Sequence, residues 1–140
     1  MKRTGAAVWR GSFKEGRGEI STQSGALASY PYAVDSRFED KTGSNPEELI
    51  GAAHASCFAM ALSLILGEAG LTADELDARA EVTLDKQDGG YAITASHLTL
   101  RAKIPGASEA QFTELAEKAK ANCPVSKLLN AQVTLDAKLV

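Results

Sequence analysis

The 140-residue sequence lacks several features that would point directly to a function. It has no excess charge of one sign, because 15 basic and 18 acidic residues are mixed along the chain and leave a net charge of −3. This balance gives no reason to expect nucleic acid or an anionic membrane as a partner. It also lacks a Gly-rich phosphate loop, a G-x-S-x-G motif and an acidic metal cluster, which are the usual signs of nucleotide binding, serine hydrolysis and metal chemistry.

The first eleven residues contain basic side chains but no apolar segment of the kind that a secretory signal needs. We therefore expect a cytoplasmic protein. In that compartment a structural disulfide is improbable, so the two cysteines, Cys57 and Cys123, are better explained by metal binding, catalysis or redox chemistry. A zinc site that combines them with His54 and His97 has no supporting C-x2-C or H-x3-H spacing, and we expect no metal or other cofactor.

Only one long apolar stretch is present, from Asn45 to Gly70. Asn45 is a suitable N-cap, Pro46 suits the first helical position and Gly70 can end the helix. A helix that is apolar on all sides either spans a membrane or lies at the centre of a core. This stretch is rich in Ala and Gly and contains His54, and the sequence has no second apolar stretch of this length. We therefore expect a buried central helix and no membrane span.

The remaining sequence alternates between short strands and amphipathic helices. The pattern predicts one domain over residues 1–140, of class α+β, with mostly antiparallel sheets around the central helix. A hairpin with its turn at Gln87–Gly90 is indicated by Asp-Gly and Gly-Gly pairs. The expected strands are Ala6–Arg10, Glu19–Thr22, Tyr30–Phe38, Leu76–Asp85, Tyr91–Ile104 and Gln132–Val140; the expected loop before the central helix is 39–44; the expected further helices are Ser108–Ala121 and Val125–Leu129.

The two cysteines stand in different sequence contexts. Cys57 lies within the apolar helix, where it is either a small core residue or, with His54 three positions earlier on the same face, part of a Cys–His nucleophile pair. A buried histidine that bonds a backbone carbonyl explains His54 equally well. Cys123 precedes Pro124 at an expected helix start, where a thiol has a lowered pKa, so the residues alone favour Cys123 as the more reactive thiol.

Three charged residues are candidates for the neighbourhood of a cysteine. Glu47 precedes Cys57 by ten residues, which on one straight helix means a rise of about 15 Å. Glu47 could act beside a cysteine only if the helix is interrupted or if a second chain supplies it. Arg37 and Arg17 are the candidate guanidinium partners, and both could equally be surface charges.

Several motifs together resemble the OsmC/Ohr family, the osmotically inducible and organic hydroperoxide resistance proteins. The likeness covers essentially the whole chain, and several of these motifs are those of the OsmC branch. The motifs are residues 45–49 (NPEEL), 52–58 (AAHASCF), 121–126 (ANCPVS), 9–11 (WRG), 36–38 (SRF) and 133–136 (VTLD).

The resemblance implies an OsmC-like fold and an intertwined homodimer with active sites at the subunit interface. It implies a thiol-dependent peroxidase that reduces organic hydroperoxides, and hydrogen peroxide less well, with a dithiol or a lipoylated protein as the reductant. Cys57 would be the peroxidatic cysteine, resolved by Cys123 as an intramolecular disulfide. Arg37 would hold the thiolate and Glu47 would orient Arg37, although the other branch takes its arginine from the region of Arg17.

The resemblance reverses the order of reactivity that the residues alone favour for the two thiols. Two other functions remain open at this point. One is a hydrolase or transferase that uses Cys57 with His54, and the other is a non-catalytic stress or binding protein with inert buried thiols.

Overall fold

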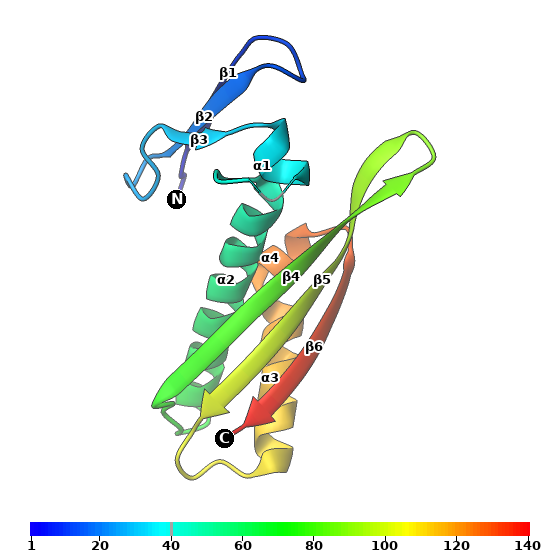
Figure 1. The fold of residues 1–140 in the computed structure, drawn as a ribbon. Helices are drawn as coiled ribbons and strands as arrows, with labels where there is room; N and C mark the ends of the chain where they lie inside the picture. Colours follow the sequence, from blue (N-terminus) through cyan, green and yellow to red (C-terminus); the bar gives the residue numbers. More distant parts are fainter. Residues whose placement is uncertain (40) are drawn as a thin grey trace. The chain divides into compact units, whose positions relative to one another are not determined.

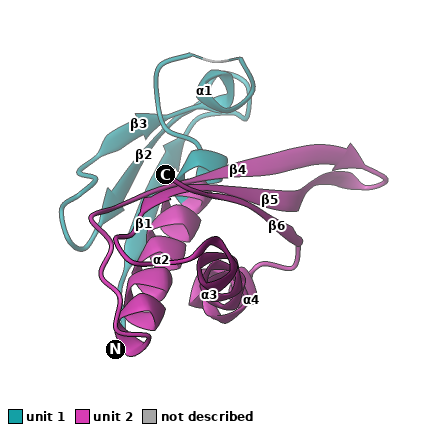
Figure 2. Cartoon of the chain, turned by 90° about the horizontal axis from the view of Figure 1, so that it is seen from below, with its two compact units in different colours: residues 1–49 teal, residues 50–140 magenta. Residues whose placement is uncertain are grey.

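The computed structural model describes residues 1–39 and 41–140 (Figure 1). The chain divides into two compact units, Met1–Leu49 and Ile50–Val140, which are coloured separately in Figure 2. The expectation of a single domain over residues 1–140 stays a prediction.

The first unit is built on a small antiparallel sheet. Its strands β1 (Gly5–Arg10), β2 (Arg17–Thr22) and β3 (Tyr30–Tyr32) lie in that order across the sheet. β1 and β2 form the predicted hairpin. β3 contains Pro31 and is an edge strand, as the missing N–H group of proline requires.

The segment after β3 differs from the prediction, because residues 34–38 form a short helix, α1 (Val34–Phe38), instead of extending the strand. The reason is the buried side chain of Ser36. Its Oγ accepts a hydrogen bond from the backbone N–H of Ala33 (2.9 Å) and lies 2.9 Å from the carbonyl oxygen of Ser44, to which it can donate. A serine hydroxyl that satisfies local backbone groups competes with strand pairing. The predicted loop 39–44 includes residue 40, which lies outside the described residues.

The long helix α2 (Pro46–Glu68) is confirmed almost residue by residue. Asn45 caps it, because its Oδ1 accepts a hydrogen bond from the backbone N–H of Glu48 (2.8 Å). The helix ends where Gly70 adopts φ +72° and the N–H of Leu71 bonds back to the carbonyl of Leu66 (2.9 Å). A residue with positive φ followed by such a bond is the usual glycine-terminated helix end.

The second unit contains a three-stranded sheet in the order β4-β5-β6, with β4 (Glu75–Gln87), β5 (Gly90–Lys103) and β6 (Gln132–Leu139). β4 and β5 form the predicted antiparallel hairpin. β6 pairs with β5 in parallel, whereas the other three strand pairings are antiparallel, so the sheets are mostly antiparallel as expected. The helices α3 (Glu109–Asn122) and α4 (Pro124–Leu128) lie between β5 and β6 in the chain, and parallel strands need a crossover of this kind.

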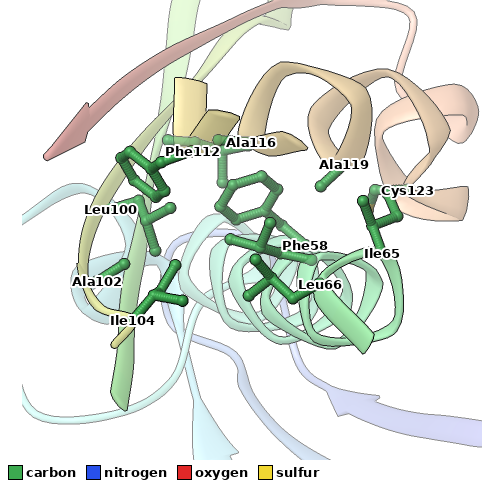
Figure 3. Close-up of a cluster of buried hydrophobic side chains, with 12 residues drawn as sticks. Phe58, Ile65, Leu66, Leu100, Ala102, Ile104, Phe112, Ala116, Ala119 and Cys123 are labelled. Atoms are coloured by element: carbon green, nitrogen blue, oxygen red, sulfur yellow. The ribbon is translucent and has the colours of Figure 1, made fainter. Parts of the chain in front are cut away.

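The core of the second unit lies between the sheet and two helices. Figure 2 shows α2 and α3 on the same side of the β4-β5-β6 sheet. One face of β5 and one face of α3 are turned into this core. The fully buried apolar side chains are Phe58, Leu62 and Leu66 from α2, Leu98, Leu100 and Ala102 from β5, Phe112, Ala116 and Ala119 from α3, and Cys123. Figure 3 shows Phe58, Phe112 and Cys123 in this cluster.

In the single chain α2 is not buried on all sides, contrary to the expectation for a central helix. Its buried residues occupy one face, whereas Met60 and Leu64 are 75% and 67% exposed. The helix is long and apolar enough to pass a length-and-composition test for a membrane span, which the core helix of a soluble protein also passes. Its outer face is therefore an apolar surface that this chain alone leaves uncovered.

Candidate active site

The two cysteines, far apart in the sequence, come together in the second unit. Cys57 lies midway along α2 and is half-buried, and Cys123 is fully buried at the junction of α3 and α4. Both are free thiols, and they lie near enough for each to shift the pKa of the other. This proximity agrees with a thiol pair that can close to a disulfide, although the sequence spacing alone does not predict it.

Cys123 is fixed by two helix ends that meet at one residue. Its N–H donates to the carbonyl of Ala119 (2.9 Å) and closes α3, while its carbonyl accepts from the N–H of Lys127 (3.1 Å) and opens α4. Pro124 occupies the first turn of α4, as predicted. This double role holds the sulfur of Cys123 at a defined position against α2.

The two thiols differ in acidity. Burial raises the pKa of Cys57, and its hydrogen bond to Cys123 raises it further. Burial also acts to raise the pKa of Cys123, but hydrogen bonds from Cys57, from the backbone and hydroxyl of Ser126 and from the backbone of Val125 outweigh it. The pKa of Cys123 is therefore lowered, as the sequence context of this residue suggests.

His54 forms neither of the contacts that were considered for it. Its Nδ1 lies 2.7 Å from Oγ of Ser96 on β5, and its Nε2 lies 2.8 Å from Oγ of Ser126 on α4. Burial lowers the pKa of this fully buried imidazole. Because both ring nitrogens are bonded to hydroxyls, His54 is not positioned as the base of Cys57, and its hydrogen-bond partners are serines instead of a backbone carbonyl.

Sequence reasoning missed Ser96 and Ser126. Ser96 belongs to the inward face of β5, which the strand periodicity identifies, and a polar residue among leucines on such a face is a sign of a buried partner. Ser126 stands three residues after Cys123, so it lies in the first turn of α4 close to the thiol. Their common partner on α2 could not be deduced from spacing.

The other two candidate residues form an ion pair within the first unit. Nε of Arg37 lies 3.2 Å from Oε2 of Glu47, and its Nη2 lies 2.7 Å from Oε1 of the same carboxylate. This fork geometry fixes the plane of the guanidinium as well as its distance. The guanidinium carbon also lies 5.4 Å from the ring centre of Phe38.

Arg17, the alternative arginine, has different partners. Its Nη1 donates to the carbonyl of Gly16 (2.8 Å), and its Nη2 lies 3.8 Å from Oδ2 of Asp35. Of the two arginines, Arg37 is therefore the one that Glu47 orients.

An apolar cavity of about 190 Å³ in the first unit has Arg37 in its wall. Aromatic rings provide much of its lining, and the rings of Trp9 and Tyr32 lie 5.4 Å apart at 49°. A cavity that combines apolar walls with one guanidinium suits a small molecule that has an apolar body and an oxygen-bearing group. The other residues that line it are Phe13, Ala33, Val34, Phe38 and Pro46.

The structure thus brings Cys57 together with Cys123, and Arg37 together with Glu47. The first pair belongs to the second unit and the second pair to the first unit. Within residues 1–39 and 41–140, no group of three or more His, Cys, Asp or Glu side chains is arranged to hold a metal ion. His97, one of the four residues considered for zinc, is bonded to Oγ1 of Thr134.

These observations define an α+β protein with a pair of free thiols in contact. The sequence profile of the family described as OsmC-like protein matches residues 38–138. The chain is 52% identical to peroxiredoxin OsmC of Escherichia coli K12 over 139 residues, which is 99% of this chain and 97% of that protein. The chain belongs to the OsmC-like protein family, and the resemblance noted in the sequence is confirmed.

Other relatives and solved structures agree with this assignment. The organic hydroperoxide resistance protein OhrB of Bacillus subtilis is 31% identical over 87% of this chain and 88% of that protein. A crystal structure of OhrB superimposes with a TM-score of 0.68 and covers 98% of both chains at 26% identity. An OsmC-like protein of unknown function from Vibrio cholerae gives a TM-score of 0.78 over 99% of both chains; at 15% identity it supports the fold alone.

Proposed function

We propose that this protein is a thiol-dependent peroxidase that reduces organic hydroperoxides, and hydrogen peroxide less well. The observation that carries the proposal is the contact between the free thiols of Cys57 and Cys123. The relatives named peroxiredoxin OsmC and organic hydroperoxide resistance protein support the same chemistry. A cytoplasmic location fits a protein whose two thiols must be reduced again after each turnover.

In the first step the thiolate of Cys57 attacks the distal oxygen of the hydroperoxide. The O–O bond breaks, the alcohol leaves after taking up a proton, and Cys57 becomes a sulfenic acid. Burial raises the pKa of Cys57, so the thiolate needs a nearby positive charge to form at neutral pH. We assign this role to Arg37, whose permanently charged guanidinium would also stabilise the departing alkoxide.

In the second step the thiolate of Cys123 attacks the sulfur of the Cys57 sulfenic acid. The S–O bond breaks, and the departing hydroxide combines with the proton that Cys123 gave up, so that water and an intramolecular disulfide form. A dithiol or a lipoylated protein then reduces the disulfide by thiol–disulfide exchange. The two thiols already influence each other's pKa in the reduced protein, which supports closure between these two residues.

The active form that we propose is an intertwined homodimer with active sites at its interface. α2 is continuous from Pro46 to Glu68, so an interrupted helix does not bring Glu47 to Cys57 of its own chain. The remaining alternative is that Glu47, with Arg37, serves a cysteine of the second chain. The exposed apolar face of α2, with Met60 and Leu64, is the surface that such a partner would cover.

The test is single-turnover oxidation with cumene hydroperoxide in the presence of a sulfenic-acid trap such as dimedone. We expect Cys123→Ser to accumulate the trapped Cys57 adduct and Cys57→Ser to consume no peroxide. If peroxide is not consumed by the wild-type protein with a dithiol present, the proposal is wrong. Slow, monophasic labelling of both cysteines by a thiol reagent in the native protein would instead favour a non-catalytic protein. Hydrolysis that depends on His54 but not on Cys123 would favour the Cys–His alternative.

A further inference from the structure

His54 hydrogen-bonds to both Ser96 and Ser126, and none of these three residues takes part in the two proposed chemical steps. These hydrogen bonds join three segments, because His54 lies on α2, Ser96 on β5 and Ser126 on α4. His54 and Ser96 are fully buried. A buried polar group retained in a protein core carries a cost unless it is fully bonded, and here both imidazole nitrogens are bonded.

The directions of these hydrogen bonds are coupled. A neutral imidazole donates from one nitrogen and accepts at the other, and a hydroxyl has one hydrogen to donate. Ser126 also stands in the first turn of α4, the helix that Cys123 begins, and its hydroxyl is one of the groups that lower the pKa of the Cys123 thiol. If Ser126 gives its hydrogen to that sulfur, its Oγ must accept from Nε2–H of His54, and Nδ1 of His54 must then accept from Ser96.

We infer that His54 is a positioning residue that orients Ser126 as a hydrogen-bond donor to the Cys123 thiolate and so prepares the resolving step. Ser126 touches a reacting atom, whereas His54 and Ser96 act through it. The inference rests on the proposed function, because it assigns a role within the closure and reopening of the Cys57–Cys123 disulfide.

The same arrangement also determines which sulfur of the disulfide the reductant attacks. When a reducing thiolate attacks the sulfur of Cys57, the S–S bond breaks and Cys123 leaves as a thiolate, while the reductant becomes bound to Cys57 as a mixed disulfide. A more stabilised leaving thiolate departs faster. The Ser126 hydroxyl is in place to stabilise that thiolate, so the external reductant is directed to Cys57, the more exposed of the two cysteines.

The test uses two amide replacements of His54. The amide nitrogen of glutamine stands as far along its side chain as Nε2 of histidine, whereas that of asparagine reaches only as far as Nδ1. His54→Gln therefore retains an N–H donor that reaches Ser126. His54→Asn retains a polar group that reaches Ser96 but none that reaches Ser126. Ser126→Ala removes the donor itself, and Thr134→Ala, which breaks the separate His97–Thr134 bond in the same unit, is the matched control.

The measurement follows one equivalent of cumene hydroperoxide by quenched-flow and mass spectrometry, which separate formation of the Cys57 sulfenic acid from closure of the disulfide. We expect sulfenic acid to form at the wild-type rate in every variant. Closure slows about tenfold or more in His54→Asn and Ser126→Ala, because a hydrogen bond to a charged group is lost. Closure returns close to the wild-type rate in His54→Gln and stays at the wild-type rate in Thr134→Ala.

Wild-type closure in folded Ser126→Ala or His54→Asn would overturn the inference, as would equal slowing in His54→Gln and His54→Asn. A second measurement does not depend on peroxidase activity. In a Cys57→Ser background, the ultraviolet absorbance of the thiolate gives the pKa of Cys123, which should rise when Ser126→Ala or His54→Asn is added. An unchanged pKa overturns the inference, whereas absence of any peroxide reaction in the wild-type protein overturns the proposed function alone.

Discussion

The two units of this chain differ in how much of their apolar surface they bury. In the second unit large side chains such as Phe58, Phe112 and Leu98 are completely buried. In the first unit Trp9 and Phe13 are 37% and 69% exposed. The second unit therefore encloses its own core and contains the thiol pair. The first unit carries Arg37 on α1 and Glu47 at the start of α2, and its exposed apolar side chains are still available to another surface.

This comparison explains why a thiol pair and a guanidinium are placed in different kinds of environment. A disulfide can close only when two sulfurs are held in a narrow range of geometries, which a packed core provides. A substrate cavity must admit and release small molecules, which a less enclosed unit allows. This division predicts different effects for matched substitutions in the two units.

The largest effect concerns the core of the second unit. Phe112→Ala should lower the free energy of unfolding by about 3–5 kcal/mol, because it leaves a cavity among fully buried side chains. Phe13→Ala in the first unit is the matched control and should change it by less than about 0.5 kcal/mol. Both values come from urea unfolding followed by circular dichroism, at the lowest usable protein concentration. Equal losses would mean that the first unit has a core of its own.

The next prediction concerns the arginine that holds the Cys57 thiolate. Arg37→Ala should slow oxidation of Cys57 by organic hydroperoxide about 10²- to 10³-fold, the range found when one donor to a developing negative charge is removed. Arg17→Ala, the matched control, should change this rate by less than about threefold because its partners are Gly16 and Asp35. Stopped-flow kinetics measure both rates, and the opposite order would assign the role to Arg17.

A smaller effect is expected from charges on the exposed face of α2. The double change Met60→Glu with Leu64→Glu removes no buried group from the single chain, but it places two carboxylates on the surface proposed to meet a second copy. Light scattering coupled to size exclusion should show a shift from dimer toward monomer. Thr113→Glu on the exposed face of α3 is the control. A dimer that persists unchanged would exclude this face from the interface.

The smallest effect is a pH dependence of stability that arises from His54. Burial lowers the pKa of His54 below its ordinary value of 6.5, so the unfolded chain binds a proton that the folded chain does not. The stabilisation is complete above that value and is lost as the pH falls below it toward the folded-state pKa. The slope cannot exceed about 1.4 kcal/mol per pH unit for one proton.

Urea unfolding between pH 7.5 and pH 5 checks this slope. The wild-type protein should lose more stability on acidification than His54→Gln, whose side chain does not titrate. Parallel curves for the two proteins would show that His54 binds its proton equally well in the folded and unfolded chain.

Local signals in the sequence predicted much of the fold. Asn45, Gly70 and Ser108 marked helix ends through side-chain or backbone chemistry that acts within a few residues. The alternation along β5 separated its two faces, and the structure shows which of them is buried. The direction of β6 was not predictable in this way, because a strand has the same alternation whether it pairs in parallel or antiparallel.

The candidate site was less accessible to such reasoning. The cysteine pair and its roles came from the resemblance and not from spacing, because Cys57 and Cys123 are brought together only by the packing of α2 against α3 and α4. The helix α1 depends on a bond between Ser36 and Ser44, and His54 depends on Ser96 and Ser126, which lie on other elements. Contacts between segments that are far apart in the chain produce no periodic pattern of residues, so a single sequence does not reveal them.

The most direct test of the account is the state of the two cysteines after the reduced protein has reacted with one equivalent of cumene hydroperoxide. Peptide mapping under non-reducing conditions should find Cys57 joined to Cys123 within one chain, with both free thiols lost together. Recovery of both thiols unmodified, or of a disulfide that joins different chains in place of this one, would contradict the account.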